Sequence, residues 1–291
     1  MRGAAGVALV SASALLTAGA PQNPAPLALQ AFSEGRGRPL VMLGGGTPGA
    51  AEFAPHARLL ANEFRVVRLQ TLNVDRSERH QVLPSGYSLK LESAAMARAL
   101  DALGLADALD IAGHSFGALV ALDFALDHPD RVRTLVLAEP PAFWAVPREE
   151  LMATRDMRTM FELSRELDPV REPTDDQLVR FRCALGTCGI TPPAATEPGR
   201  DDWMARRAAL RGLSAVANHS DSAARLSAFR RPVLIVTGTT TVSFHRRIND
   251  ILAAALPRAE RAELPGGHGA VATAPDQFIA TLRAFLARHP D

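Results

Sequence analysis

Residues 113–117 read Gly-His-Ser-Phe-Gly, and this Gly-x-Ser-x-Gly pattern lies between an apolar run and a helical segment. Ala108–Ala112 precedes it as an expected strand, and Phe116–Leu126 follows it as an expected helix. A tight turn from strand to helix strains the residue at its centre, and side chains on either flank would collide. The pattern therefore predicts that Ser115 presents its hydroxyl at the carboxyl end of a strand. The alternative is a serine that only caps the helix.

Apolar runs alternate with helical segments on both sides of this motif. The expected strands are Leu27–Phe32, Pro39–Leu43, Phe64–Leu69, Ala108–Ala112, Val132–Ala138, Pro232–Thr237 and Arg261–Leu264. The expected helices are Ala50–Ala61, Ser88–Leu103, Phe116–Leu126, His245–Leu256 and Pro275–Ala287. Short apolar runs bounded by turn residues are typical of strands that are buried on both faces. The alternation therefore predicts a parallel sheet that is covered by helices on both sides.

Residues 141–229 interrupt the alternation. They contain no convincing strand, and their helical stretches are rich in Arg, Met and Ala with proline joints such as Pro192-Pro193. We therefore expect an α/β fold, a mostly parallel doubly wound sheet formed by residues 27–140 and 230–291, with a helical insertion at 141–229.

The first 20 residues have the layout of a secretory signal peptide. Met1-Arg2 is a positive start, residues 3–16 are uncharged and mostly apolar, and Ala18-Gly19-Ala20 offers a cleavage site. The run is too short and too rich in small residues to be a good membrane span. We expect a periplasmic or secreted protein, in which Cys183 and Cys188 could pair. With a mis-assigned start codon, the protein would be cytoplasmic.

Composition excludes several classes of protein. Of 291 residues, 47% are hydrophobic and 22% are charged, which rules out disorder and a coiled coil. The chain has 32 Lys and Arg residues against 31 Asp and Glu residues, so no basic excess exists to bind nucleic acid. Two cysteines are too few for a disulfide scaffold or a cysteine-based zinc site. The oligomeric state stays open.

Two glycine-rich segments follow other expected strands. Gly44-Gly45-Gly46 would let backbone amides approach a substrate carbonyl, so the Gly46 and Phe116 N–H groups are candidate oxyanion donors. The alternative is a plain glycine turn. His268 lies in Pro-Gly-Gly-His-Gly after the last strand, where a neutral imidazole could take the proton of Ser115. His114 is expected to pack behind the turn, and no histidine shows a ligand-like spacing.

Residues 113–117, 44–46 and 265–269 together resemble the α/β-hydrolase superfamily. The resemblance covers residues 27–140 and 230–290, and the insertion corresponds to the family's variable helical lid. It implies a serine hydrolase without a metal or an organic cofactor. One departure is Gly44, which stands where family members usually have a histidine, and which would loosen the packing of the oxyanion loop.

A second departure concerns the acid that orients the catalytic histidine. The family's usual acid position follows Gly238, but this sequence continues with three threonines up to Thr241, and Asp250 lies well into the next helix. Some branches carry the acid after the strand that follows the nucleophile helix, where Glu139 stands here. A carboxylate there would orient His268 and stabilise its imidazolium. The alternatives are a capping glutamate and one that pairs with an arginine.

A serine nucleophile implies an acyl-enzyme formed on a carboxylic ester or a lactone, and a small apolar ester-like substrate. Dehalogenases and epoxide hydrolases of this fold use an aspartate instead. Phe143 and Trp144 in the insertion are candidate substrate-binding residues, although such side chains also hold a lid on its core. The alternatives are a C–C hydrolase or peptidase of the same fold, and a non-catalytic ligand-binding homologue, which the missing acid at Thr241 would fit.

Overall fold

The computed structural model describes residues 27–290, and in them seven strands form one sheet. The strands are β1 (Gln30–Glu34), β2 (Arg38–Leu43), β3 (Phe64–Gln70), β4 (Leu109–His114), β5 (Val132–Ala138), β6 (Val233–Gly238) and β7 (Ala259–Leu264). Their order is β1-β3-β2-β4-β5-β6-β7, and every pair is parallel except β1 with β3. The predicted fold class is confirmed. The expected signal peptide lies outside the described residues.

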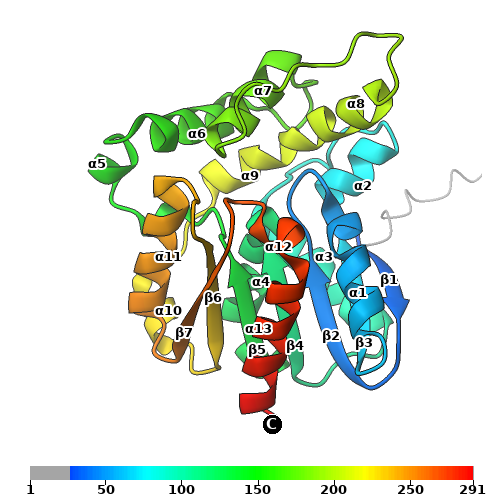
Figure 1. Cartoon of the computed structure of the whole chain (residues 1–291), viewed down its shortest axis with the longest axis vertical. Coiled ribbons are helices and arrows are strands. Elements are labelled where there is room, and N and C mark those ends of the chain that lie inside the picture. The colour runs from blue at the N-terminus through cyan, green and yellow to red at the C-terminus, as the bar shows by residue number, and fades with distance from the viewer. Residues whose placement is uncertain (1–26, 291) are drawn as a thin grey trace, which may run out of the picture.

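Helices cover both faces of the sheet because its strands are apolar on both faces. On one face, α1 (Ala54–Leu60) and α13 (Pro275–Arg288) pack on residues such as Leu40 and Met42. On the other face, α3 (Leu89–Ala102), α4 (Ser115–Asp127) and α11 (Ser243–Ala255) pack on the alternate residues, such as Val41 and Leu43. Figure 1 shows these two layers with the sheet between them.

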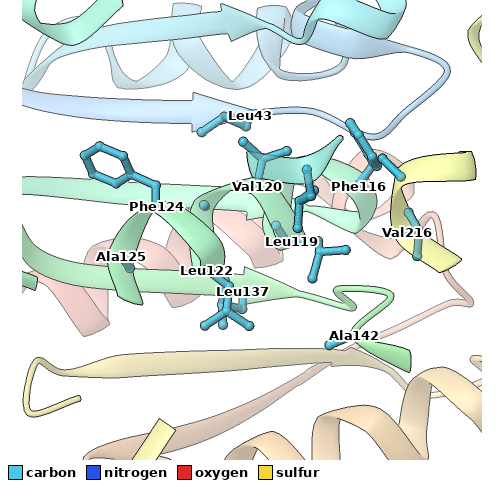
Figure 2. Packing of buried hydrophobic residues seen from close by; sticks show 14 of the residues in the cluster. Leu43, Phe116, Leu119, Val120, Leu122, Phe124, Ala125, Leu137, Ala142 and Val216 are labelled. Atoms are coloured by element: carbon cyan, nitrogen blue, oxygen red, sulfur yellow. The ribbon is translucent and has the colours of Figure 1, made fainter. Parts of the chain in front are cut away.

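The helix α4 is apolar apart from Asp123 and is enclosed, because residues Phe116–Leu126 are all buried. A helix of this kind belongs in a core rather than at a surface. Figure 2 shows its side chains among Leu43 of β2, Leu137 of β5 and Val216 of the insertion. This packing fixes the amino-terminal end of α4, where Ser115 lies.

The insertion, residues 141–229, contains helices and no strand. The helices are α5 (Arg148–Leu151), α6 (Arg155–Glu166), α7 (Asp175–Ala184), α8 (Arg200–Ala209), α9 (Leu213–Asn218) and α10 (Ala223–Ala228), with short 3-10 turns at Phe143–Ala145 and Leu210–Gly212. In Figure 1, α6 to α9 lie together across one end of the sheet. A disulfide joins Cys183, in the last turn of α7, to Cys188 in the following loop.

The structure differs from the sequence-based expectation at two places near the sheet edge. The segment expected as one helix at 50–61 is a 3-10 turn, Gly49–Phe53, followed by α1, whose first turn accommodates Pro55. An unexpected helix, α2 (Leu72–Glu78), follows β3. The buried Glu92 carboxylate accepts from the Leu72 and Asn73 N–H groups at 2.8 and 3.1 Å, so α2 is capped by a residue distant in sequence.

Two further elements complete the described residues. They are the 3-10 turn Pro129–Arg131 before β5 and the short helix α12 (Ala270–Thr273). No helix within residues 27–290 is both long enough and apolar enough to cross a membrane.

Candidate active site

Ser115 lies at the sharp turn between β4 and α4 and has a φ of 51°, a left-handed conformation that is rare for residues other than glycine. A Cβ atom on Gly113 would lie 2.5 Å from the Ala118 Cα atom. A Cβ atom on Gly117 would lie 2.4 Å from the carbonyl oxygens of Leu43 and Gly44. Only glycine therefore fits at both flanks, and the turn can be this tight. The strained residue is Ser115, whose hydroxyl faces the cavity above the turn.

His268 and Glu139 complete a chain of hydrogen bonds from Ser115. The Ser115 hydroxyl lies 3.0 Å from the His268 Nε2 atom, to which it can donate. The His268 Nδ1–H group donates to the Glu139 Oε2 atom at 2.7 Å. The structure therefore brings together all three side chains that sequence reasoning proposed, although they are far apart in the chain. This arrangement allows an imidazole to take the serine proton while a carboxylate holds its other nitrogen.

Glu139 follows β5 with a φ of 49° and is 2% exposed. Its Oε1 atom accepts the Gly238 N–H group at 2.7 Å, and its Oε2 atom accepts the Thr241 hydroxyl at 2.8 Å. Burial alone would raise the pKa of Glu139, but the His268 hydrogen bond and the nearby His245 and His268 rings lower it to about 2. Thr241, at the family's usual acid position, thus supports a carboxylate on the neighbouring strand.

The environment of His268 favours the neutral form of its ring. Its pKa is lowered by burial, and the Glu139 carboxylate opposes that shift only in part. The ring of His245 stacks on that of His268, with centroids 4.1 Å apart and planes 10° apart. Burial and the neighbouring His268 lower the pKa of His245 well below its usual value, so this second imidazole is also neutral. A neutral His268 is the form that accepts a proton.

The candidate oxyanion loop, residues 44–46, is held by hydrogen bonds at Gly45 and Gly46. The Gly45 N–H group donates to the Glu52 Oε2 atom at 2.7 Å. The Asn73 Nδ2 atom donates to the Gly46 carbonyl at 2.7 Å and to the Ala209 carbonyl at 3.0 Å. The expected loosening at Gly44 is therefore not what the structure shows, because Glu52 and Asn73 hold the loop from two sides.

Glu52 also contacts the residue before the serine. Both of its carboxylate oxygens lie 2.9 Å from the His114 Nδ1 atom, and the His114 Nε2–H group donates to the His268 carbonyl at 2.8 Å. Burial opposes both charges, yet the attraction and hydrogen bond between the two groups lower the pKa of Glu52 and raise that of His114. This buried ion pair therefore links three segments: the candidate oxyanion loop, the serine turn and the loop that carries His268.

Two cavities meet at Ser115. The enclosed cavity is narrow and is lined mainly by apolar side chains, including Phe143, Met160 and Phe244. The open cleft is wider, and its lining includes His268, Arg182 and Arg206. Gly46 lines both cavities, whereas Phe116 lines only the enclosed one. A bond held over Ser115 would thus have an apolar side and a polar side.

The structure separates the two substrate-binding candidates. Phe143 lines the enclosed cavity, but Trp144 lines neither of the two cavities. Both residues lie in a 3-10 turn, in which consecutive side chains point about 120° apart. Trp144 instead packs edge-on against His219, with ring centroids 6.3 Å apart. The sequence-based assignment of Trp144 to the substrate site is therefore not supported by its position.

Comparison with known proteins places this geometry in a family. A family model described as "alpha/beta hydrolase fold" matches residues 38–170. A protein from Caulobacter vibrioides (strain NA1000 / CB15N) named "Putative carbamate hydrolase RutD" is 31% identical over 258 residues, which are 86% of this chain and 91% of that protein. The chain belongs to the α/β-hydrolase superfamily.

Solved structures of other α/β hydrolases share the fold. A thermophilic esterase from Thermogutta terrifontis has a TM-score of 0.65 at 19% identity, and the match covers 90% of this chain and 94% of that one. The enol-lactonase from Burkholderia xenovorans LB400 has a TM-score of 0.60 at 22% identity, with 89% and 96% covered. At these identities the likeness concerns the fold alone.

Sequence reasoning missed several residues of this α/β hydrolase site. Glu52, Asn73 and His245 carry no motif, and each reaches the site from a different element. The position of His245 could have indicated that it lies at the site. It is near the start of the helix after β6, at the edge where the parallel strands end. No comparable local signal marks Glu52 or Asn73.

Two groups within residues 27–290 offer three potential metal ligands each, and the first is Glu139 with His245 and His268. The two rings are nearly parallel, so their in-plane lone pairs do not converge on one point. The second group is Asp123, His219 and Asp221, where the Lys90 ammonium already contacts Asp123 at 2.8 Å. Neither arrangement of this α/β hydrolase fits a metal centre.

Proposed function

We propose that this α/β hydrolase is a serine hydrolase that cleaves a carboxylic ester or a lactone through an acyl-enzyme. The observation that carries the proposal is the continuous chain from the Ser115 hydroxyl through His268 to Glu139, at 3.0 and 2.7 Å. A merely structural serine needs neither a neutral imidazole on its oxygen nor a buried carboxylate behind that imidazole.

The proposed reaction has two halves. The Ser115 Oγ atom bonds to the substrate carbonyl carbon while its proton passes to His268 Nε2, and the Gly46 and Phe116 N–H groups stabilise the oxyanion. The bond to the leaving oxygen then breaks, and His268 returns the proton to that oxygen. In the second half, a water gives a proton to His268 and its oxygen bonds to the acyl carbon. The bond between that carbon and Ser115 Oγ then breaks, His268 returns the proton to Oγ, and the carboxylic acid is released. Glu139 stays ionised throughout.

The shape of the site supports a small substrate with an apolar acyl group. The enclosed cavity beside Ser115 is lined by aromatic and aliphatic side chains, and such walls favour apolar groups. In this proposal Phe143, which lines that cavity, contacts the acyl group of the substrate. An amide or a C–C bond presents a poorer leaving group to the same residues, so a peptidase or a C–C hydrolase is the weaker candidate.

A carbamate is the second candidate substrate class. The curated relatives that match most of this chain are named as carbamate hydrolases, and the identity reaches 31% over 258 residues. A carbamate carbonyl is bonded to a nitrogen and an oxygen, and Ser115 could attack it by the same steps as an ester carbonyl. The two classes differ in the group on the acyl side, which would be polar in a carbamate and would enter an apolar cavity.

Two measurements test the proposal. Wild type and Ser115→Ala are treated with a fluorophosphonate probe, and peptide mass spectrometry locates the adduct. Matched aryl esters, lactones, carbamates and amides are then assayed with both proteins. We expect an adduct on Ser115 and hydrolysis of esters or lactones that Ser115→Ala lacks. Absence of an adduct would favour a ligand-binding homologue, and faster turnover of carbamates would favour the second candidate.

We also propose that the mature protein works in an oxidising compartment, either the periplasm or outside the cell. The layout of residues 1–20 and the pairing of Cys183 with Cys188 support this proposal. Intact mass measurement of the protein isolated from its native host is the test. A mature chain that starts at Pro21 is expected, and a chain that retains Met1 would contradict export.

A further inference from the structure

We infer that the open cleft beside His268 binds an anionic group on the leaving-group side of the substrate, and that Arg182 is its main contact. This inference rests on the proposed function, because it assigns the two sides of the scissile bond to the two cavities at Ser115. It names the substrate class more closely: an ester or lactone whose alcohol side carries a carboxylate or a phosphate.

The position of His268 decides which cavity holds the leaving group. The imidazole that takes the serine proton must return it to the leaving oxygen, so that oxygen has to lie within reach of His268 Nε2. His268 lines the open cleft and does not line the enclosed cavity. The leaving group therefore extends into the cleft, and the acyl group enters the enclosed apolar cavity.

Arg182 is a charged residue of this cleft without a carboxylate partner. It lies near the end of α7, is half-buried, and lines the cleft together with Ser115 and His268. Its Nε–H group donates to the Thr187 hydroxyl at 3.3 Å. No Asp or Glu oxygen among residues 27–290 lies within ion-pair distance of its guanidinium.

Other arginines of the insertion do have such partners. Arg180 pairs with Glu166 at 2.8 Å, Arg207 pairs with Asp175 at 2.7 Å, and Arg206 pairs with Asp202 at 2.9 Å. Arg182 differs from these three arginines because it has no carboxylate partner in the described part of the chain, and it lines the same cleft as Ser115. A group that is always charged and partly withdrawn from water gains most from an anionic ligand.

The charges around the cleft reinforce this reading. Arg206 lines the same cleft, and both burial and repulsion from Arg206 lower the pKa of Arg182. The acidic groups nearby are already engaged, since Glu52 pairs with His114 and Asp202 pairs with Arg206. Glu78 lies in the adjoining hollow, where it accepts from Gln70 at 3.0 Å. An anion in the cleft would relieve the repulsion between the two guanidinium groups.

The planar guanidinium also suits a carboxylate or a phosphate, because either group can accept two parallel N–H bonds from it. Thr187 lies on the same wall of the cleft and holds the Nε side of Arg182. This leaves the terminal nitrogens of the guanidinium available to a ligand.

The test compares two substrates that share an acyl group and differ by one charge, 4-acetoxybenzoate and its methyl ester. The ratio of their kcat/KM values is measured for wild type, Arg182→Gln, Arg182→Lys and Arg155→Gln. Arg155 is an exposed arginine of the insertion that lines neither cavity, so it controls for loss of net charge. Intrinsic differences between the two leaving groups cancel when ratios are compared between variants.

We expect Arg182→Gln to lower the preference for the anionic ester by about tenfold or more, as for loss of a hydrogen bond to a charged group. Arg182→Lys should restore part of the preference, and Arg155→Gln should leave it unchanged. Added salt should lower turnover of the anionic ester more than turnover of the methyl ester. An unchanged ratio in Arg182→Gln, with both esters still hydrolysed, would overturn the inference.

A binding measurement keeps this test separate from the proposed function. Titration calorimetry with 4-hydroxybenzoate and its methyl ester is performed on Ser115→Ala, with and without Arg182→Gln. Preferential binding of the acid that depends on Arg182 supports the anionic subsite even if no ester is hydrolysed. Equal binding of the two compounds, or a preference that survives Arg182→Gln, contradicts it.

Discussion

Both carboxylate oxygens of Glu52 lie 2.9 Å from the Nδ1 atom of His114, inside the protein and directly behind the reactive serine. The carboxylate also holds the Gly45 N–H group, and the imidazole also holds the carbonyl of His268. One ion pair thus connects the three loops that carry the proposed nucleophile, the proposed base and the proposed oxyanion donors. The pair holds these loops together at the wall of the open cleft, which both residues line.

Replacing Glu52 by Gln should lower the free energy of unfolding by about 3 kcal/mol, because it leaves a buried imidazolium without its counter-charge. Glu63→Gln is the control, since Glu63 forms an exposed pair with Arg283 and should cost less than about 1 kcal/mol. Urea denaturation at pH 6 measures both variants. An equal loss of unfolding free energy in the two variants would show that the buried pair stabilises the protein no more than the exposed pair does.

The same ion pair predicts a pH window for stability. The pKa of Glu52 is lowered from 4.5, so its contribution is lost as pH falls below that value; the pKa of His114 is raised from 6.5, so its contribution is lost as pH rises above that value. The pair should stabilise most between these limits. Wild type and Glu52→Gln should therefore differ most near pH 5.5, as measured by urea denaturation across the pH range.

Mutagenesis can separate the contribution of Glu139, which accepts from His268, from that of Thr241, which donates to Glu139. Glu139→Gln should lower kcat by about 10⁴, the cost of removing the acid in a related triad. Thr241→Ala removes one hydrogen bond to the carboxylate and should lower kcat by about tenfold or less. Asp250→Asn is the control, because Asp250 pairs with Arg261 away from the site. Full turnover by Glu139→Gln would exclude Glu139 as the acid.

The pH profile of kcat/KM should reflect the neutral state of His268. Its pKa is lowered from 6.5, so activity should rise with pH through a midpoint below 6.5 and stay level at neutral pH. Because the Glu139 carboxylate raises the pKa of His268, the midpoint of the residual activity in Glu139→Gln should move to a lower pH. A midpoint above 7 in wild type would contradict this assignment.

Close contact around the serine turn makes Gly117 irreplaceable. A methyl group there would meet the carbonyl oxygens of Leu43 and Gly44 at 2.4 Å, so Gly117→Ala should cost about 2–3 kcal/mol of stability through overpacking. Gly269→Ala is the matched control, because no atom other than those of its chain neighbours lies within 4 Å of the position its Cβ would take. Thermal denaturation compares the two variants. Similar melting temperatures would show that the turn can shift to make room.

The Cys183–Cys188 disulfide closes a short loop on the wall of the cleft. Replacing both residues by Ser should lower stability by about 2 kcal/mol, as expected for a loop of this length. It should also reduce the preference for anionic esters, because Thr187, which holds Arg182, lies inside the loop. Dithiothreitol should weaken the same preference in wild type and leave the double variant unaffected. An equal effect on both would rule out this role.

Much of the architecture could be predicted from local sequence. The strands and the long helices follow from apolar runs, helical spacing and their capping residues, such as Ser88, which accepts the Leu91 N–H group at the start of α3. The helix α2 could not be predicted, because its first N–H groups are satisfied by Glu92 from another helix. The direction of the Trp144 side chain, away from both cavities, could not be predicted from composition either.

The sequence by itself determined the parts of this protein that depend on neighbouring residues. The serine turn requires glycines two positions before and after Ser115, and His268 stands in a glycine-rich loop after the last strand, so both carry a local signature. The tertiary structure alone decided which distant side chains meet there: Thr241 on Glu139, Glu52 on His114, and Arg182 at the cleft. These contacts arise because parallel strands end at one edge of the sheet, and chain order says little about which side chains converge at that edge.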